Sequence, residues 1–216
     1  MNRTLEHILP RVQKPARYTG GEYNAVVKDR RAVDVRYALC FPDTYEIGMS
    51  NLGVRILYGL MNEMEGVWCE RVFAPCGDME EEMRREGIPL YGLESGDSIA
   101  DFDLIGFSLG YEMAYTNVLN ILDLAGLPLR SGERTELSPI VVAGGTCAFN
   151  PEPLAPFVDL FVLGEGEDVS VEIIQLYRQA REEGWGKEEF LTAAARIPGV
   201  YVPSLYEVSY HGDAFV

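Results

Sequence analysis

The sequence predicts an α/β fold with three layers, in which helices cover both faces of a doubly wound parallel sheet. Two observations predict this fold class. Apolar strand-like runs alternate with helix-like runs along most of the 216 residues. The strand-like runs are also almost continuously apolar, as expected for parallel strands that are buried on both faces. The length suits one such domain with a small extension.

The elements begin after an irregular N-terminal arm of residues 1–31, which has prolines and glycines around one short helix. A first strand is predicted over 32–42, in AVDVRYALCFP. The run NLGVRILYGLMNEM then has helical spacing of apolar residues, and Ser50 and Asn51 before or at its start are N-cap candidates. WCERVFAP is a short second strand, and GDMEEEMRREG is a charged helix that Gly87 ends.

The same alternation continues toward the C-terminus. Buried strands are predicted in DFDLIGFSLG (101–110), SPIVVAGG and VDLFVLGEGE, and helical runs are YEMAYTNVLNILDLAG and DVSVEIIQLYRQAREEG. Residues 186–216 add one helix and an edge strand or hairpin. Five strand–helix units joined by right-handed crossovers predict a flavodoxin-like sheet. We therefore assign the α/β domain to residues 32–185.

Composition argues against several classes of function. The chain has 34 acidic and 18 basic residues and a formal net charge of −16, so its surface repels phosphate backbones and no nucleic-acid contact is expected. It has neither a bilayer-length apolar run nor a secretory signal, which predicts a cytoplasmic protein without membrane contact. The four cysteines form no C-x-x-C pair, so we expect free thiols and no metal site. No pattern of catalytic residues is recognisable.

Four loops are candidates for a binding site. Ligands of doubly wound sheets bind outside the carboxyl ends of the strands, near the point where strand order reverses. In this chain that rule selects loops 42–51, 108–112, 144–150 and 164–167. The candidate cofactor-binding residues in these loops are Asp43, Tyr45, Gly48, Ser108, Gly144, Gly145, Gly164, Glu165 and Gly166.

The first loop contains the pattern D-x-Y-x-x-G, formed by Asp43, Tyr45 and Gly48. One residue separates it from D-x-H-x-x-G, by which many cobalamin-binding domains ligate cobalt. A phenol with a pKa near 10 is mostly protonated at neutral pH, so Tyr45 is a poor replacement for that ligand. Two interpretations stay open. Tyr45 offers a flat aromatic surface below a bound ring, or the three residues only shape a turn and its packing.

The other loops also have structural alternatives. Gly144 and Gly145 would let a ligand approach the strand end, or would form a tight turn. Ser108 could hydrogen-bond a ligand or a backbone group at the strand end. Glu165 and the acids after it suit a helix N-terminus. Those same acids disfavour a phosphate there, which weakens an FMN or nucleotide-binding hypothesis, as does the lack of a phosphate loop.

The order of these motifs resembles a known family. IVVAGGTCAFNPEPLAPFVDLFVLGEGED is similar to the stretch before the radical domain in cobalamin-binding-type radical S-adenosylmethionine (SAM) proteins. LPRVQKPARYTGGEYNAVVKD and FPDTYEIGMSNLGVRILYGLMN resemble the opening of one branch of that superfamily of Fe-S oxidoreductases. The resemblance covers nearly all of the chain. It implies a fold of the cobalamin-binding-domain type at the front of a radical SAM protein.

The resemblance also implies a division of functions. The cluster motif C-x-x-x-C-x-x-C is absent, so the [4Fe-4S] cluster and SAM are expected only in a downstream radical SAM domain beyond residue 216. This chain would hold cobalamin without a histidine ligand, or place an unknown substrate against the radical barrel, and would not catalyse a reaction alone. Tyr45 would lie under the corrin ring, and Ser108, Gly144 and Gly145 along the nucleotide tail. The alternative is a degenerate domain without a cofactor that serves docking or substrate recognition.

Overall fold

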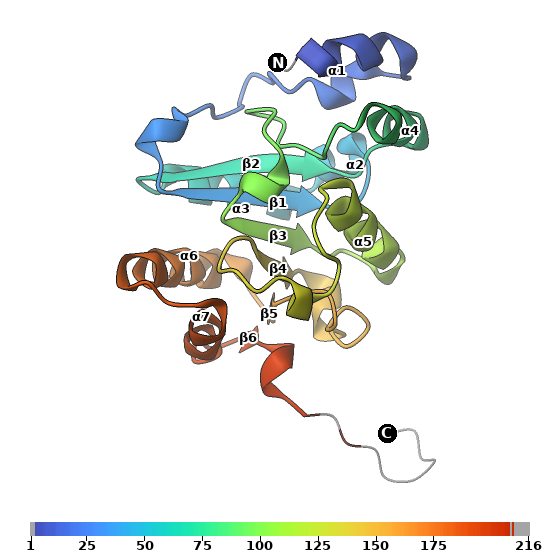
Figure 1. Cartoon of the computed structure of the whole chain (residues 1–216). Coiled ribbons are helices and arrows are strands. Elements are labelled where there is room, and N and C mark those ends of the chain that lie inside the picture. The colour runs from blue at the N-terminus through green and yellow to red at the C-terminus, as the bar shows by residue number, and fades with distance from the viewer. Residues whose placement is uncertain (1–2, 208, 210–216) are drawn as a thin grey trace.

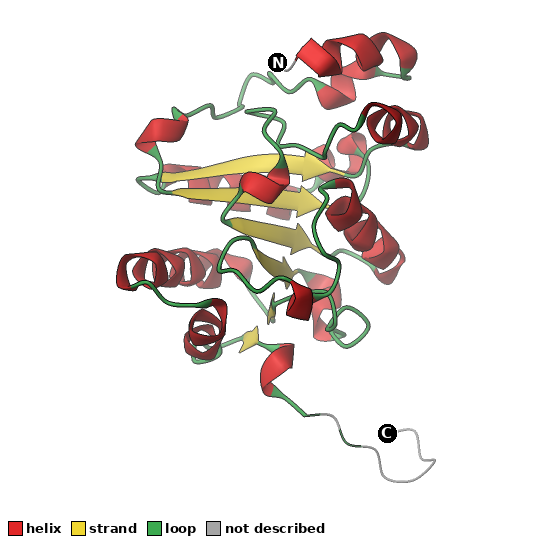
Figure 2. Cartoon of the chain, in the orientation of Figure 1, coloured by secondary structure: helices red, strands yellow, loops and turns green. Residues whose placement is uncertain are grey.

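The computed structural model describes residues 3–207 and 209 and confirms the predicted fold class (Figure 1). One mostly parallel sheet has helices on both faces (Figure 2). Its order is β2-β1-β3-β4-β5-β6, so strand order reverses between β1 and β3, as in flavodoxin-like sheets. The strands are β1 (Val35–Phe41), β2 (Val67–Phe73), β3 (Leu104–Ser108), β4 (Ile140–Gly144), β5 (Leu160–Val162) and β6 (Val200–Tyr201).

Helices from different parts of the chain form the two outer layers. The α-helices are α1 (Arg3–Ile8), α2 (Tyr45–Ser50), α3 (Leu52–Glu63), α4 (Gly77–Glu86), α5 (Tyr115–Leu124), α6 (Gly166–Glu183) and α7 (Lys187–Ala194). The core on one face of the sheet includes α3, α6 and α7, and the core on the other includes α1, α4 and α5. Asn51 caps α3, since its side chain accepts a hydrogen bond from the Val54 N–H at 3.0 Å. Gly87, in the left-handed conformation, ends α4 as predicted.

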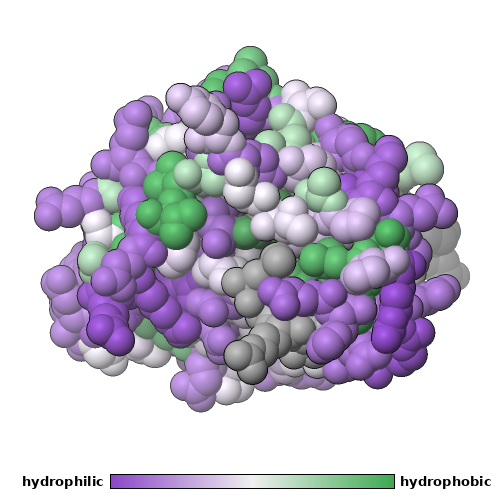
Figure 3. Space-filling view, turned by 90° about the horizontal axis from the view of Figure 1, so that it is seen from above, coloured by the Kyte–Doolittle hydropathy of each residue, from purple (hydrophilic) through white to green (hydrophobic). Residues whose placement is uncertain are grey.

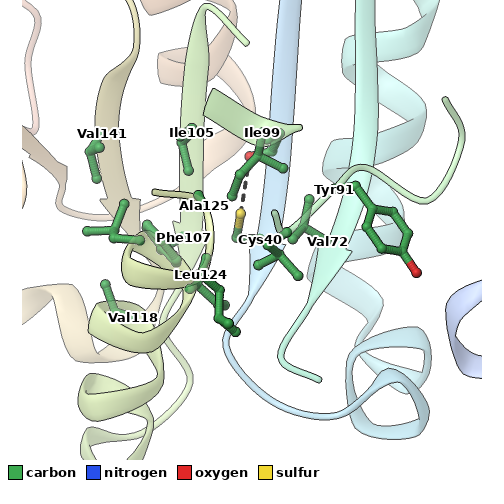
Figure 4. Close-up of a cluster of buried hydrophobic side chains, with 14 of the residues drawn as sticks. Cys40, Val72, Tyr91, Ile99, Ile105, Phe107, Val118, Leu124, Ala125 and Val141 are labelled. Atoms are coloured by element: carbon green, nitrogen blue, oxygen red, sulfur yellow. Dashed lines mark hydrogen bonds between the residues drawn. The ribbon is translucent and has the colours of Figure 1, made fainter. Parts of the chain in front are cut away.

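Alternate residues of each strand contribute to opposite cores. In β1, Cys40 packs with the α4 and α5 layer, whereas Tyr37 and Leu39 pack with the α3 and α6 layer. Figure 4 shows Cys40 together with apolar side chains of the neighbouring strands and of α5. Burial raises the pKa of the Cys40 thiol, which keeps it protonated as a small apolar residue.

The connection between β4 and β5 differs from the five strand–helix units that the sequence predicts. Residues 145–159 contain a 3-10 turn, Thr146–Phe149, and no α-helix. Pro151, Pro153 and Pro156 fall in this segment, and proline removes a backbone donor and clashes within a helix. After α7, β6 pairs antiparallel with β5 at the edge of the sheet, as predicted. The predicted hairpin would involve residues 208 and 210–216, which lie outside the described residues.

The N-terminal arm packs on the sheet domain rather than extending from it. Ile8, Leu9 and Val12 are buried in the same core as α4, and α1 lies beside that helix in Figure 1. Seen from above, this side of the molecule is mostly hydrophilic, with apolar residues in small separate groups (Figure 3). Among residues 3–207 and 209, no helix combines the length and the apolar character needed to cross a membrane.

Candidate functional site

A cavity of about 170 Å³ lies where the carboxyl ends of β1, β3, β4 and β5 meet helices α3 and α6. It is therefore next to the point at which strand order reverses, where ligands of this fold class bind. The structure brings five of the predicted residues together around it, and these are Ser108, Gly144, Gly145, Gly164 and Gly166.

Missing side chains on two neighbouring strands explain the hollow. Gly106 on β3 and Gly144 on β4 both line the cavity, and β3 pairs with β4 through Ser108 and Gly144. A Cβ atom at residue 106 would lie 1.9 Å from the Tyr37 hydroxyl oxygen. Glycine at 106 therefore lets the phenol of Tyr37 cross from β1 over β3 and reach the cavity.

The cavity wall includes buried polar groups without protein partners. Tyr37 is only 5% exposed, and burial raises the pKa of its hydroxyl, which stays neutral. Among the described residues its hydroxyl has no hydrogen-bond partner, and the same holds for the hydroxyls of Ser108 and of Ser170, which is 9% exposed. A ligand that displaces water from such a group without replacing its hydrogen bond loses about 1–3 kcal/mol, so the arrangement favours a polar ligand.

The remaining glycines of this edge have distinct roles. Gly145 has a φ of 96°, and a Cβ there would lie 2.8 Å from the Leu109 carbonyl oxygen. That contact joins the loops after β3 and β4, so Gly145 allows a tight turn and also lines the cavity. Gly164 has a φ of 115° and open space around its missing side chain. Glu165 is the N-cap of α6 and makes no capping hydrogen bond through its side chain.

The D-x-Y-x-x-G residues do not line this cavity. Tyr45 begins α2, packs edge-on against Phe73 with ring centres 5.5 Å apart, and donates a hydrogen bond to Glu22 Oε1 at 2.7 Å. Burial, with the Glu22 carboxylate second, raises the pKa of Tyr45 to about 12. A Cβ at Gly48 would lie 2.2 Å from the Phe73 ring, so this glycine allows α2 to pack closely.

A charged network beside Tyr45 is absent from the sequence-based predictions. Arg71 on β2 donates to Glu94 Oε1 at 2.6 Å and to Glu22 Oε2 at 2.6 Å, and its guanidinium lies 5.0 Å from the centre of the Tyr58 ring. Burial alone would raise the pKa of Glu22, but hydrogen bonds from Tyr45 and Arg71 outweigh it and leave the pKa lowered. Glu22 thereby fixes the arm to the sheet. The partners lie 23 and 49 residues from Arg71 in the chain, so no short motif indicates them.

The loops after β1, β3 and β4, here called the rim, combine a polar bridge with exposed apolar side chains. Asp43 accepts hydrogen bonds from the Thr44 N–H at 2.6 Å and from the Tyr111 hydroxyl, which links the loops after β1 and β3. Met113 and Phe149, from the loops after β3 and β4, are 83% and 70% exposed. The loops after β3 and β4 therefore each expose a large apolar side chain.

The site is suited to binding. In the part of the chain that the structure describes, no group of three or more His, Cys, Asp or Glu residues could hold a metal ion. The cavity wall instead combines glycines, hydroxyls and the carboxylate of Glu167 with apolar side chains. Such a concave site with a few polar groups is typical of small-molecule binding.

Comparisons with known proteins find sequence similarity but no matching solved structure. The profile of the family described as "Radical SAM proteins, N-terminal" matches residues 53–203, which include all of the cavity lining except that from β1. An uncharacterized protein of Methanocaldococcus jannaschii is 28% identical over 140 residues, which are 63% of this chain and 26% of that protein. The chain thus spans about a quarter of that relative's length. No solved structure matches the chain.

Proposed function

The chain belongs to the family of N-terminal domains of radical SAM proteins, and from this premise we propose that it binds cobalamin for a longer radical SAM protein. The nucleotide tail enters the cavity at the carboxyl edge of the sheet, and the corrin ring rests on the rim. The bound group would supply a cobalt centre able to hold a methyl group. The chain's own residues only bind and orient it.

The observation that best supports this proposal is the glycine-walled cavity, in which the hydroxyl of Tyr37 has no hydrogen-bond partner among the described residues. A cavity of about 150 Å³ holds one benzene molecule, so about 170 Å³ suits an aromatic base and is far too small for a corrin ring. The tail, rather than the ring, is therefore the part that this space fits. Ser108, Gly144 and Gly145 take the tail-lining role that the resemblance implies.

Cobalamin would be held without a cobalt ligand from the protein. None of the loops 42–51, 108–112, 144–150 and 164–167 contains histidine. Tyr45 is hydrogen-bonded to Glu22 and packed on Phe73, and its raised pKa disfavours the phenolate that a metal ligand would require. Its proposed role is therefore to support the rim close to the ring.

The iron–sulfur cluster and SAM would be bound elsewhere in the longer protein. The chain has no C-x-x-x-C-x-x-C motif, and the relative from Methanocaldococcus jannaschii is about four times as long as the matched segment. We place the arm at residues 1–31, the cobalamin-binding domain at 32–185, and a connection to the radical domain at 186–216. The substrate would meet cobalamin and the radical domain where the two face each other.

A second candidate function is a docking module without a cofactor. The exposed side chains of Met113 and Phe149 favour it, because apolar groups on a rim suit a protein partner. In that case the rim would contact the radical domain or the substrate directly, and the cavity would have no resident ligand.

Calorimetric titration separates the two functions. The chain is titrated with hydroxocobalamin and, separately, with cobinamide, which has the corrin ring but lacks the nucleotide and its base. We expect cobalamin to bind in the micromolar range and cobinamide to bind more weakly, because only cobalamin fills the cavity. If neither binds up to high micromolar concentrations, the docking module becomes the better explanation.

A further inference from the structure

The polar groups of the cavity come from three separate elements. Tyr37 belongs to β1, Ser108 ends β3, and Glu167 and Ser170 belong to the first turns of α6. Tyr37 and Ser170 are both more than nine-tenths buried, and neither hydroxyl has a hydrogen-bond partner among the described residues, so their pairing depends on what fills the cavity. A ligand that pairs with them gains more than one that only fills the volume.

The chemistry of these groups restricts what can lie against them. Hydroxyls donate and accept hydrogen bonds, whereas the carboxylate of Glu167 only accepts. A matching ligand must therefore present at least one donor. The phosphate of the nucleotide tail must therefore lie away from Glu167, because both are negative, and the base is the part that can lie beside this carboxylate. Apolar contacts from Leu39, Leu57 and Val142 complete the wall and suit the faces of a planar ring.

We propose that Tyr37, with Ser170 and Glu167, selects corrinoids whose lower base carries a hydrogen-bond donor, such as adenine, over those with dimethylbenzimidazole. This inference rests on the proposed cobalamin-binding function. Adenine presents an amino group and ring nitrogens at its edge. The methyl groups of dimethylbenzimidazole would displace water from the hydroxyls of Tyr37 and Ser170 without pairing with them. Sites built around buried hydrogen-bonding groups discriminate strongly against ligands that lack the partner.

The test compares corrinoids that differ only in the base. The full chain is titrated with the adenine form, with the dimethylbenzimidazole form and with cobinamide, and the affinities are measured by calorimetry. We expect the adenine form to bind about tenfold more tightly than the dimethylbenzimidazole form, or better. In Tyr37→Phe we expect the adenine form to lose most of this advantage, whereas the affinity for dimethylbenzimidazole stays within about twofold.

Two further variants make the result specific. Ser170→Ala should also reduce the preference for the adenine form, because it removes the second hydroxyl proposed to pair with the base. Tyr91→Phe is the matched control, because Tyr91 is also a buried tyrosine but belongs to the core on the opposite face of the sheet. It should keep the preference. Circular dichroism and thermal melting establish that each variant is folded.

The outcomes distinguish this inference from the function on which it rests. Equal affinity of the native chain for both base-containing forms would overturn the base selection and leave cobalamin binding intact. A preference that survives unchanged in folded Tyr37→Phe and Ser170→Ala would overturn the assignment of these residues. If no corrinoid binds, the proposed function itself fails, and the base selection fails with it.

Discussion

Filling the cavity from Gly144 should weaken cobalamin binding without unfolding the chain. The backbone at Gly144 is not in the left-handed region, and a Cβ there would meet Val162 at 3.6 Å, an ordinary contact distance. A leucine side chain can therefore extend into the cavity. An empty cavity costs ~24 cal/mol per Å³ of its volume. For about 170 Å³, a leucine that filled the cavity completely would remove about 4 kcal/mol of the free energy that the tail gains by filling it. Because 1.4 kcal/mol is tenfold in affinity, Gly144→Leu should raise the Kd for cobalamin by up to ~10³-fold.

The assay is calorimetric titration with hydroxocobalamin, after circular dichroism has shown that the variant is folded. Gly132→Leu is the matched control, because a Cβ at Gly132 meets no atom within 4 Å and this residue does not line the cavity. Its affinity should equal that of the native chain. Cobinamide lacks the tail, so its affinity should be the same for the native chain and for Gly144→Leu. A folded Gly144→Leu that binds cobalamin as tightly as the native chain would refute the placement of the tail.

Three further predictions concern stability. Arg71→Met should lower the free energy of unfolding, measured in urea, by about 3–5 kcal/mol, because the Glu94 side chain is 0% exposed and would lose its cation. A loss under about 1 kcal/mol would contradict this. The pKa of Glu22 is lowered from its ordinary 4.5, so its stabilising effect on the arm is complete above that pH and is lost as the pH falls through the folded pKa. Proteolysis of the arm should therefore rise as the pH falls below 4.5 and through the lowered pKa of Glu22, whereas in Glu22→Gln it should not change over this pH range. Gly145→Ala should lower the free energy of unfolding by about 1–3 kcal/mol, because alanine is strained at this positive φ and its Cβ would contact Leu109. Thermal melting measures the loss, and an unchanged melting temperature would argue against that strain.

Most of the fold follows from local patterns in the sequence. The apolar runs around Val35–Phe41 and Leu104–Ser108 became parallel strands because most of their residues are apolar and suit burial on both faces of the sheet. Asn51 caps the start of α3 and Gly87 ends α4 as expected, since capping depends on nearby backbone groups. The missing α-helix before β5 is the main difference, and it follows from the prolines of 145–159.

The candidate site was predictable only in part. The topological rule selected loops that do meet, and Ser108 and Gly144 line one cavity. The rule could not indicate Tyr37, because this residue lies in the middle of a strand and reaches the cavity only through the glycine at 106 on the next strand. The rule also could not show that Tyr45 lies outside the cavity lining. The position of Tyr45 depends on Glu22, an arm residue that is 23 residues away in the chain.

The visible absorption spectrum of methylcobalamin bound to the native chain tests the central claim most directly. If the nucleotide tail occupies the cavity, its base cannot also coordinate cobalt. No histidine in the four loops can take its place, so the spectrum should change to the base-off form on binding. A bound spectrum that stays base-on would show that the tail remains under the ring and outside the cavity, and would contradict the account.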